Sequence, residues 1–108
     1  MISRWRMMWL YAMFDLPVYT RTQRHDATKF RNFLLDEGFE RAQYSVYIRF
    51  CATRERLEAQ INRIEPVVPP DGTVHLLSVT DKQFEQIRSF FAGDRQRLRG
   101  KPEQMALF

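Results

Sequence analysis

A chain of 108 residues, 44% of them hydrophobic, is long enough for one folded domain and too apolar for a disordered chain. No apolar run reaches the length of a membrane span, and the first one leads into Asp15 without a small-residue cleavage site, so we expect a cytoplasmic protein. The net charge of +4 is uneven, with a balance of +4 over residues 1–31, −2 over residues 32–93 and +2 over residues 94–108, which favours a polyanionic partner.

The first predicted element is a strand at residues 7–15, where an unbroken apolar run ends in one carboxylate, Asp15. Such a run is typical of a strand buried on both faces, although periodicity alone does not exclude a buried helix. Pro17 fixes its own φ and biases Leu16 toward extended geometry, so the strand should end near Asp15. An acid at that position is a candidate for chemistry, and the alternative is that Asp15 caps the following turn.

A helix is predicted next, over residues 21–37, because Thr20 and Gln23 have the spacing of a capping box and Gly38 is a typical helix stop. One face of this helix carries apolar residues at helical spacing: Ala27, Phe30, Phe33 and Leu34. The opposite face carries basic residues: Arg21, Arg24, His25 and Arg31. A solvated surface explains each of them singly, whereas the cluster near a helix N-terminus could hold phosphate.

Two strands and a second helix follow. Strand-forming residues predict a short strand at residues 39–42 and a longer one at residues 45–51. Thr53 can cap a helix over residues 54–65. The inner face of that helix should carry three apolar residues: Leu57, Ile61 and Ile64.

The last predicted elements follow the proline-rich loop at residues 66–72. A strand is predicted at residues 73–79, and Thr80 with Gln83 repeats the capping-box spacing to open a short third helix that Gly93 ends. An apolar stripe marks this helix: Phe84, Ile87, Phe90 and Phe91.

The C-terminal part is predicted to lie outside the folded domain. Residues 1–93 form the domain, and residues 94–108 form a basic link followed by a docking strand at residues 105–108, which would fray unless it packs on something.

The predicted order of elements is strand, helix, strand, strand, helix, strand, with a third helix added. This is the split βαβ arrangement, an α+β fold with an antiparallel sheet and two helices on one face. The other face needs cover, and Tyr11, Tyr44 and Tyr47 suit a half-buried sheet face. We therefore expect a symmetric homodimer, packed sheet against sheet.

Most catalytic templates are absent from the sequence, which has no Cys/His metal spacing, no glycine-rich phosphate loop and no G-x-S-x-G elbow. What remains is a carboxylate with a divalent metal such as Mg²⁺ or Mn²⁺, since Mg²⁺ keeps several waters and needs only one or two carboxylates. One chain supplies only Asp15 in a suitable place, whereas two chains related by a dyad supply two. A metal held there could activate water against a phosphodiester.

Four segments carry a family resemblance: residues 11–17 (YAMFDLP), 29–34 (KFRNFL), 38–39 (GF) and 43–47 (QYSVY). Together they resemble the Cas-two family of CRISPR adaptation proteins. The type II branch of that family is resembled by residues 74–84 (VHLLSVTDKQF) and by the apolar end at Leu107 and Phe108.

The resemblance implies a ferredoxin-like homodimer at the centre of a spacer-acquisition complex, flanked by two dimers of the Cas-one integrase. It also implies a Mg²⁺-dependent endonuclease, with Asp15 as the metal-binding and catalytic acid.

Three functions stay open at this point. One is a metal nuclease using Asp15. The second, which we favour, is a scaffold that grips the backbone of double-stranded DNA. Eight basic residues are expected to make that grip: Arg4, Arg6, Arg21, Arg24, Arg31, Arg95, Arg97 and Arg99. The third is a non-CRISPR RNA-binding module of the same element order, although the Gly/aromatic signature of such modules is absent from residues 45–50.

Overall fold

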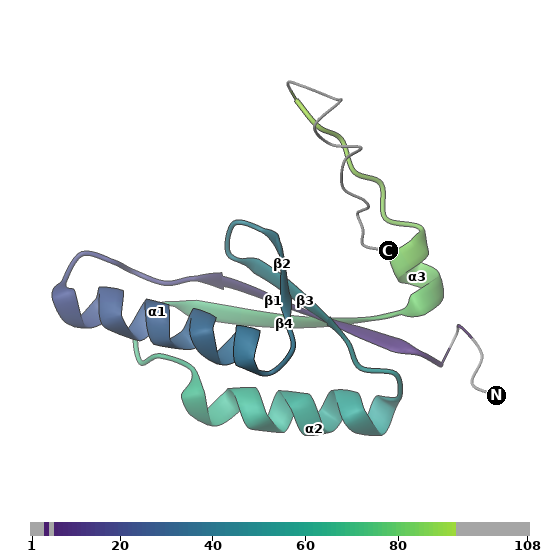
Figure 1. The fold of residues 1–108 in the computed structure, drawn as a ribbon, viewed down its shortest axis with the longest axis horizontal. Coiled ribbons are helices and arrows are strands. Elements are labelled where there is room, and N and C mark those ends of the chain that lie inside the picture. The colour runs from purple at the N-terminus through teal and green to yellow at the C-terminus, as the bar shows by residue number, and fades with distance from the viewer. Residues whose placement is uncertain (1–3, 5, 93–108) are drawn as a thin grey trace.

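The computed structural model describes Arg4 and residues 6–92, and this part of the chain has the predicted α+β, ferredoxin-like order of elements (Figure 1). Its strands are β1 (Met8–Asp15), β2 (Glu40–Gln43), β3 (Val46–Phe50) and β4 (Thr73–Thr80). Its helices are α1 (Arg21–Asp36), α2 (Arg54–Ile64) and α3 (Asp81–Glu85), with a 3₁₀ turn at Glu65–Val67. The strands form an antiparallel sheet in the order β2-β3-β1-β4, so the central β1 pairs with both β3 and β4.

Burial alternates along β1 and defines an inner and an outer face of the sheet. The inner face points toward α1 and α2 and carries fully buried residues: Met8, Leu10, Ala12 and Phe14. Trp9, Tyr11 and Met13 alternate with them on the outer face and are only half-buried. The predicted strand is thus confirmed, but it is completely buried on one face rather than on two.

Local capping groups fix both long helices where the sequence predicted them. The Thr20 Oγ1 accepts a hydrogen bond from the Gln23 backbone N–H at 3.0 Å, and the Gln23 Oε1 accepts one from the Thr20 N–H at 3.1 Å. Thr53 accepts from the Arg56 N–H at 3.2 Å and opens α2. Gly38, with φ of +96°, ends α1 in the left-handed region that favours glycine.

The hydrophobic core lies between the inner sheet face and these two helices. From α1 it takes Ala27, Phe30 and Leu34, and from α2 it takes Leu57 and Ile64. The predicted apolar faces are therefore confirmed, with Phe33 and Ile61 partly buried at the margin of the core.

Two tyrosine placements differ from the prediction. Tyr47 pairs with Ala12 on the inner face, where it is buried, and its ring centroid lies 5.5 Å from that of Phe14. Tyr44 lies in the turn between β2 and β3. Only Tyr11 lies on the outer face as expected, because β1 and β3 meet in a register that sets Tyr11 opposite Ile48.

The third helix is shorter than predicted, since α3 ends at Glu85 instead of continuing to Gly93. Phe84 packs on the outer sheet face, with its ring stacked on Trp9 at a centroid distance of 4.0 Å. The next apolar residues find no such surface within the described part of the chain, and Phe90 is 88% exposed. A helix gains most of its stability from packing, so the stripe alone does not extend it.

The predicted link, terminal strand and domain limit all depend on residues 93–108 and lie outside the described residues. No helix in the described part combines the length and the apolar character that a bilayer crossing requires.

Candidate functional site

Asp15 ends β1 on the outer face of the sheet, on the side away from α1 and α2. It follows Trp9, Tyr11 and Met13 at alternate positions, and it is opposite Thr73 of β4. Its side chain is exposed, and among the described residues no hydrogen bond to the Asp15 carboxylate is found. The alternative role of Asp15 as a turn cap therefore gains no support from its contacts.

Two backbone contacts fix the position of Asp15. The Phe14 N–H donates to the Ser45 carbonyl at 3.1 Å, which joins the end of β1 to the turn between β2 and β3. Gly72 passes so close that a Cβ there would lie 2.6 Å from the Asp15 carbonyl oxygen and 2.9 Å from the Pro17 Cδ. With a φ of +94° as well, the position of Gly72 requires glycine.

The donor atoms near Asp15 come mainly from β4. Thr73 is paired with Asp15, and His75, two residues along, shares the same face through its pairing with Met13. Within Arg4 and residues 6–92, no group of three or more His, Cys, Asp or Glu side chains could hold a metal. Mg²⁺ retains water and needs few carboxylates, so Asp15 fits such an ion best with a second carboxylate from outside the chain.

The outer face becomes strongly apolar further along β1 from Asp15. By register it includes Trp9 and Tyr11 of β1, Phe50 of β3 and Leu77 of β4. Phe50 is 42% exposed and Leu77 is 49% exposed, while burial raises the pKa of the Tyr11 phenol. Phe84 covers only the Trp9 end of this face. In the described part of the chain, Leu77 lies opposite Tyr11 and Phe50 opposite Trp9, so this exposed apolar surface begins four residues along β1 from Asp15.

Arg4 has a structural role that sequence reasoning missed. Its guanidinium forms ion pairs of 2.7 Å with Asp81 and with Glu85, and these hydrogen bonds raise the pKa of Arg4. Asp81 also accepts a hydrogen bond of 2.7 Å from the Trp9 Nε1–H. These contacts attach α3 to the start of β1, so folding accounts for Arg4 without any phosphate.

The other predicted DNA-binding residues differ in their surroundings. Arg6 and Arg21 are exposed. Arg24 is exposed and donates to the Val18 and Tyr19 carbonyls at 3.2 and 3.3 Å, which draws it back over the loop between β1 and α1. Arg31 is half-buried and donates to the Thr28 hydroxyl at 3.1 Å. Arg95, Arg97 and Arg99 lie outside the described residues. Arg21 and Arg24 lie in the first turn of α1, six and nine residues along the chain from Asp15.

Two exposed tyrosines near this end of the sheet were not predicted as site residues. Tyr19 is 88% exposed in the loop after β1, and Tyr44 is 82% exposed in the turn next to Ser45. The Arg41 guanidinium lies 5.4 Å from the Tyr44 ring centroid. Both tyrosines lie between predicted helices and strands, and an aromatic in a connecting segment is a signal that could have identified them.

Comparison with known proteins identifies the family. The family described as "CRISPR associated protein Cas2" matches residues 8–87, which is most of the chain. The chain belongs to the Cas2 family. This is the Cas-two family that the sequence motifs predicted, and membership leaves a non-CRISPR RNA-binding module without support. The narrower resemblance to the type II branch stays a prediction.

Curated relatives match the chain over nearly its whole length. A protein of Paracidovorax avenae is 44% identical over 108 residues, covering 100% of both chains. A protein of Flavobacterium psychrophilum is 41% identical over 99% of this chain and 93% of its own length. A third, from Parvibaculum lavamentivorans, is 44% identical over 94% of this chain and 100% of its own length. All three carry the name "CRISPR-associated endoribonuclease Cas2".

Proposed function

We propose that this Cas2-family protein acts in CRISPR spacer acquisition, as a homodimeric scaffold that holds double-stranded DNA and joins two Cas-one integrase dimers. The observation that supports this role most directly is the uncovered apolar outer face of the sheet, where Phe50 and Leu77 are exposed on the same face as Asp15. A second copy packed sheet against sheet would cover these side chains. The same dyad would bring the two Asp15 residues together.

The DNA contacts in this proposal come from arginines at the N-terminal side of the domain. Arg6, Arg21 and Arg24 are exposed, and the free backbone N–H groups at the start of α1 favour phosphate. The half-buried Arg31 and the C-terminal Arg95, Arg97 and Arg99 complete the proposed set. Both long helices contain Asn, Gln and Arg, but Gln23 is bonded in the cap of α1 and Gln60 of α2 is buried. Neither helix therefore offers the three side chains together on an exposed face, and binding should depend on phosphate and not on base sequence.

A salt series on two unrelated duplexes tests this proposal. For wild type, log affinity should fall with log salt at a slope of roughly −0.9 per phosphate neutralised. Arg24→Ala should reduce the slope by about one and weaken both duplexes alike. Arg54→Ala, which removes an exposed arginine from α2 outside the proposed set, should leave the slope unchanged. A strong preference for one duplex, or an affinity independent of salt, would contradict the scaffold.

A metal-dependent endonuclease is the second candidate, supported by the exposed Asp15 carboxylate and by the names of the relatives. Asp15 from each of two copies would hold Mg²⁺ or Mn²⁺, which when bound supplies a Lewis acid able to activate water against a phosphodiester of DNA or RNA. The chain's own contribution is to fix the Asp15 backbone through Ser45 and Gly72.

Asp15→Ala separates the two candidates. If acquisition of new spacers in cells continues normally in this variant, the scaffold role is independent of the carboxylate. If acquisition stops while the purified variant keeps its mass and its duplex affinity, the carboxylate chemistry is essential. Metal binding gives a second readout, because wild type should bind one Mn²⁺ per two chains. Binding of one Mn²⁺ per chain, or binding unchanged in Asp15→Asn, would contradict a shared site.

A further inference from the structure

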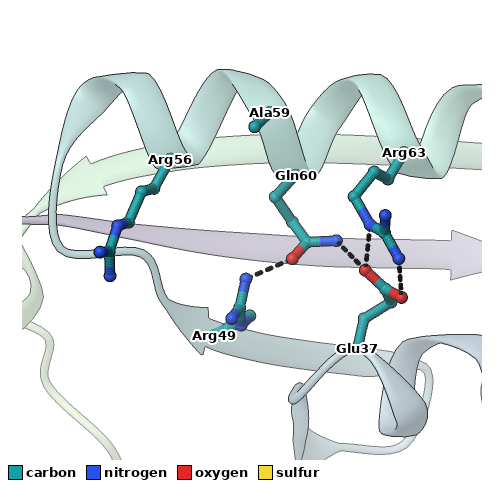
Figure 2. A pocket seen from close by; sticks show the side chains of 6 residues that line it. All are labelled: Glu37, Arg49, Arg56, Ala59, Gln60 and Arg63. Carbon is teal, nitrogen blue, oxygen red and sulfur yellow. Dashed lines mark hydrogen bonds and ion pairs between the residues drawn. The ribbon is translucent and has the colours of Figure 1, made fainter.

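A polar groove lies between α2, the C-terminal end of α1 and β3 (Figure 2). Its volume is about 340 Å³, and six residues line it: Glu37, Arg49, Arg56, Ala59, Gln60 and Arg63. Arg49 is paired with Leu10 on the inner face of the sheet. Asp15 lies five residues further along β1 and on the outer face, so the groove is a separate site.

The groove arises because one stripe of α2 is polar where a core stripe would be apolar. Arg56, Gln60 and Arg63 lie at positions i, i+4 and i+7 of the helix, which places them along roughly 10 Å of its length. Gln60 is 2% exposed although it is polar. Arg49 reaches across Gly38, where a Cβ would lie 3.0 Å from the Arg49 Nε. Gly38 therefore leaves room for the guanidinium.

A hydrogen-bonded network holds one half of the groove. The Arg63 Nε and Nη2 donate to the two Glu37 carboxylate oxygens, each at 2.6 Å. The Gln60 Nε2 donates to the Glu37 Oε1 at 3.1 Å, and the Gln60 Oε1 accepts from the Arg49 Nη1. Hydrogen bonding to Arg63 lowers the pKa of Glu37 to about 2, so its charge persists. This network ties the end of α1 to α2 and fixes the direction of Arg49.

The charges of the groove do not balance. Three guanidinium groups meet one carboxylate, and both oxygens of that carboxylate bind Arg63. Arg56 makes no side-chain hydrogen bond or ion pair with a described residue, and no acid lies three or four positions from it on the helix. Arg49 uses one of its five N–H donors on Gln60. The network that joins α1 to α2 does not need Arg56. Four other residues are sufficient for it: Glu37, Arg49, Gln60 and Arg63.

We propose that this groove binds a phosphoryl group, with Arg49 and Arg56 as the side chains that bind it. Guanidinium groups recognise phosphate through paired N–H donors, and Gln60 has already fixed the direction of one of them. Ala59 is the one apolar lining residue, so the groove offers little surface to the apolar body of a ligand and selects for an anionic head. The phosphoryl group can come from the phosphorylated end of a nucleic acid or from a free nucleotide. This inference does not depend on the dimer or on Asp15.

The test uses the full chain with inorganic phosphate as the probe, at constant ionic strength maintained with chloride. The side-chain Nε–H resonances of Arg49 and Arg56 should shift in NMR spectra as phosphate replaces chloride. Arg56→Ala should weaken phosphate binding by at least about tenfold, the usual effect of losing a charge-assisted hydrogen bond. Arg54→Ala, which removes the same charge from the same helix outside the groove, should bind phosphate as wild type does.

The proposal would be overturned if Arg56→Ala and Arg54→Ala bound phosphate with equal affinity. It would also be overturned if chloride alone shifted the Arg49 and Arg56 Nε–H resonances as much as phosphate does. Matching thermal midpoints of Arg56→Ala and wild type would show that any lost binding is not lost folding. A 5′-phosphorylated trinucleotide and AMP identify the source of the phosphate. Tighter binding of the trinucleotide, lost in Arg56→Ala, assigns the groove to nucleic-acid ends, and equal affinity assigns it to free nucleotides. Duplex binding by Arg24→Ala is measured separately, so failure of the scaffold and failure of the groove remain distinguishable.

Discussion

Replacing Gly72 by Ala should destabilise the protein and displace the end of β1 that carries Asp15. Gly72 has a φ of +94°, and left-handed backbone costs a non-glycine residue about 1–2 kcal/mol. The added Cβ would also lie 2.6 Å from the Asp15 carbonyl oxygen, which is backbone and has to shift. Forced overpacking of this kind costs about 1–3 kcal/mol more. We therefore expect Gly72→Ala to lower the free energy of unfolding by about 2–5 kcal/mol.

Gly38→Ala is the matched control, because Gly38 has a nearly identical φ of +96°. Its added Cβ would meet only the Arg49 side chain, at 3.0 Å from Nε, and that side chain can move. The backbone cost of about 1–2 kcal/mol should then be the main effect. Denaturant unfolding of both variants at one protein concentration measures the difference. If Gly38→Ala lowers the free energy of unfolding as much as Gly72→Ala does, the close approach of Gly72 to the Asp15 carbonyl oxygen does not add to the destabilisation.

Three further predictions follow from other contacts. The lowered pKa of Glu37 means that its ion pair with Arg63 stabilises the fold fully above pH about 4.5, and that this contribution is lost as pH falls toward 2. The difference in the free energy of unfolding between wild type and Glu37→Gln should therefore become smaller as the pH is lowered. A difference that does not change with pH would contradict this prediction. Phe84→Ala should cost about 1–3 kcal/mol and increase Trp9 solvent exposure, measured by fluorescence; unchanged emission would show that the stacked rings are unimportant. Asp15→Ala should leave the thermal midpoint nearly unchanged, because its carboxylate is exposed; a large drop would mean that Asp15 is structural.

The sequence was a good guide where structure depends on neighbouring residues. Thr20 with Gln23, Thr53 and Gly38 define helix ends through contacts within a few residues, so α1 and α2 begin and end close to where they were predicted. Asp15 was selected as a candidate site residue because it ends an unbroken apolar run, and the structure confirms its place at the end of β1. The predicted length of α3 was wrong because a short helix ends where its packing surface ends, and an apolar stripe in the sequence does not show where that is.

Contacts between distant parts of the chain could not be predicted in this way. The ion pairs of Arg4 join residues 77 and 81 positions apart, so nothing near Arg4 in the sequence indicates them. Gln60 was overlooked because Glu37, whose carboxylate accepts a hydrogen bond from the Gln60 amide, is 23 positions away in the sequence. The placement of Tyr47 on the inner face depends on strand register, and a shift of one residue would have placed it on the outer face.

The central claim is that a second copy covers the apolar outer face of the sheet and so brings the two Asp15 residues together. The most direct test is the mass in solution, by sedimentation, of Leu77→Glu and of its control Leu35→Glu. Both leucines are 49% exposed, but Leu77 lies on the outer sheet face and Leu35 lies on α1. We predict that wild type and Leu35→Glu have twice the 13.0 kDa mass of one chain and that Leu77→Glu has the mass of one. A monomeric wild type, or a Leu77→Glu variant that remains a dimer, would contradict the claim.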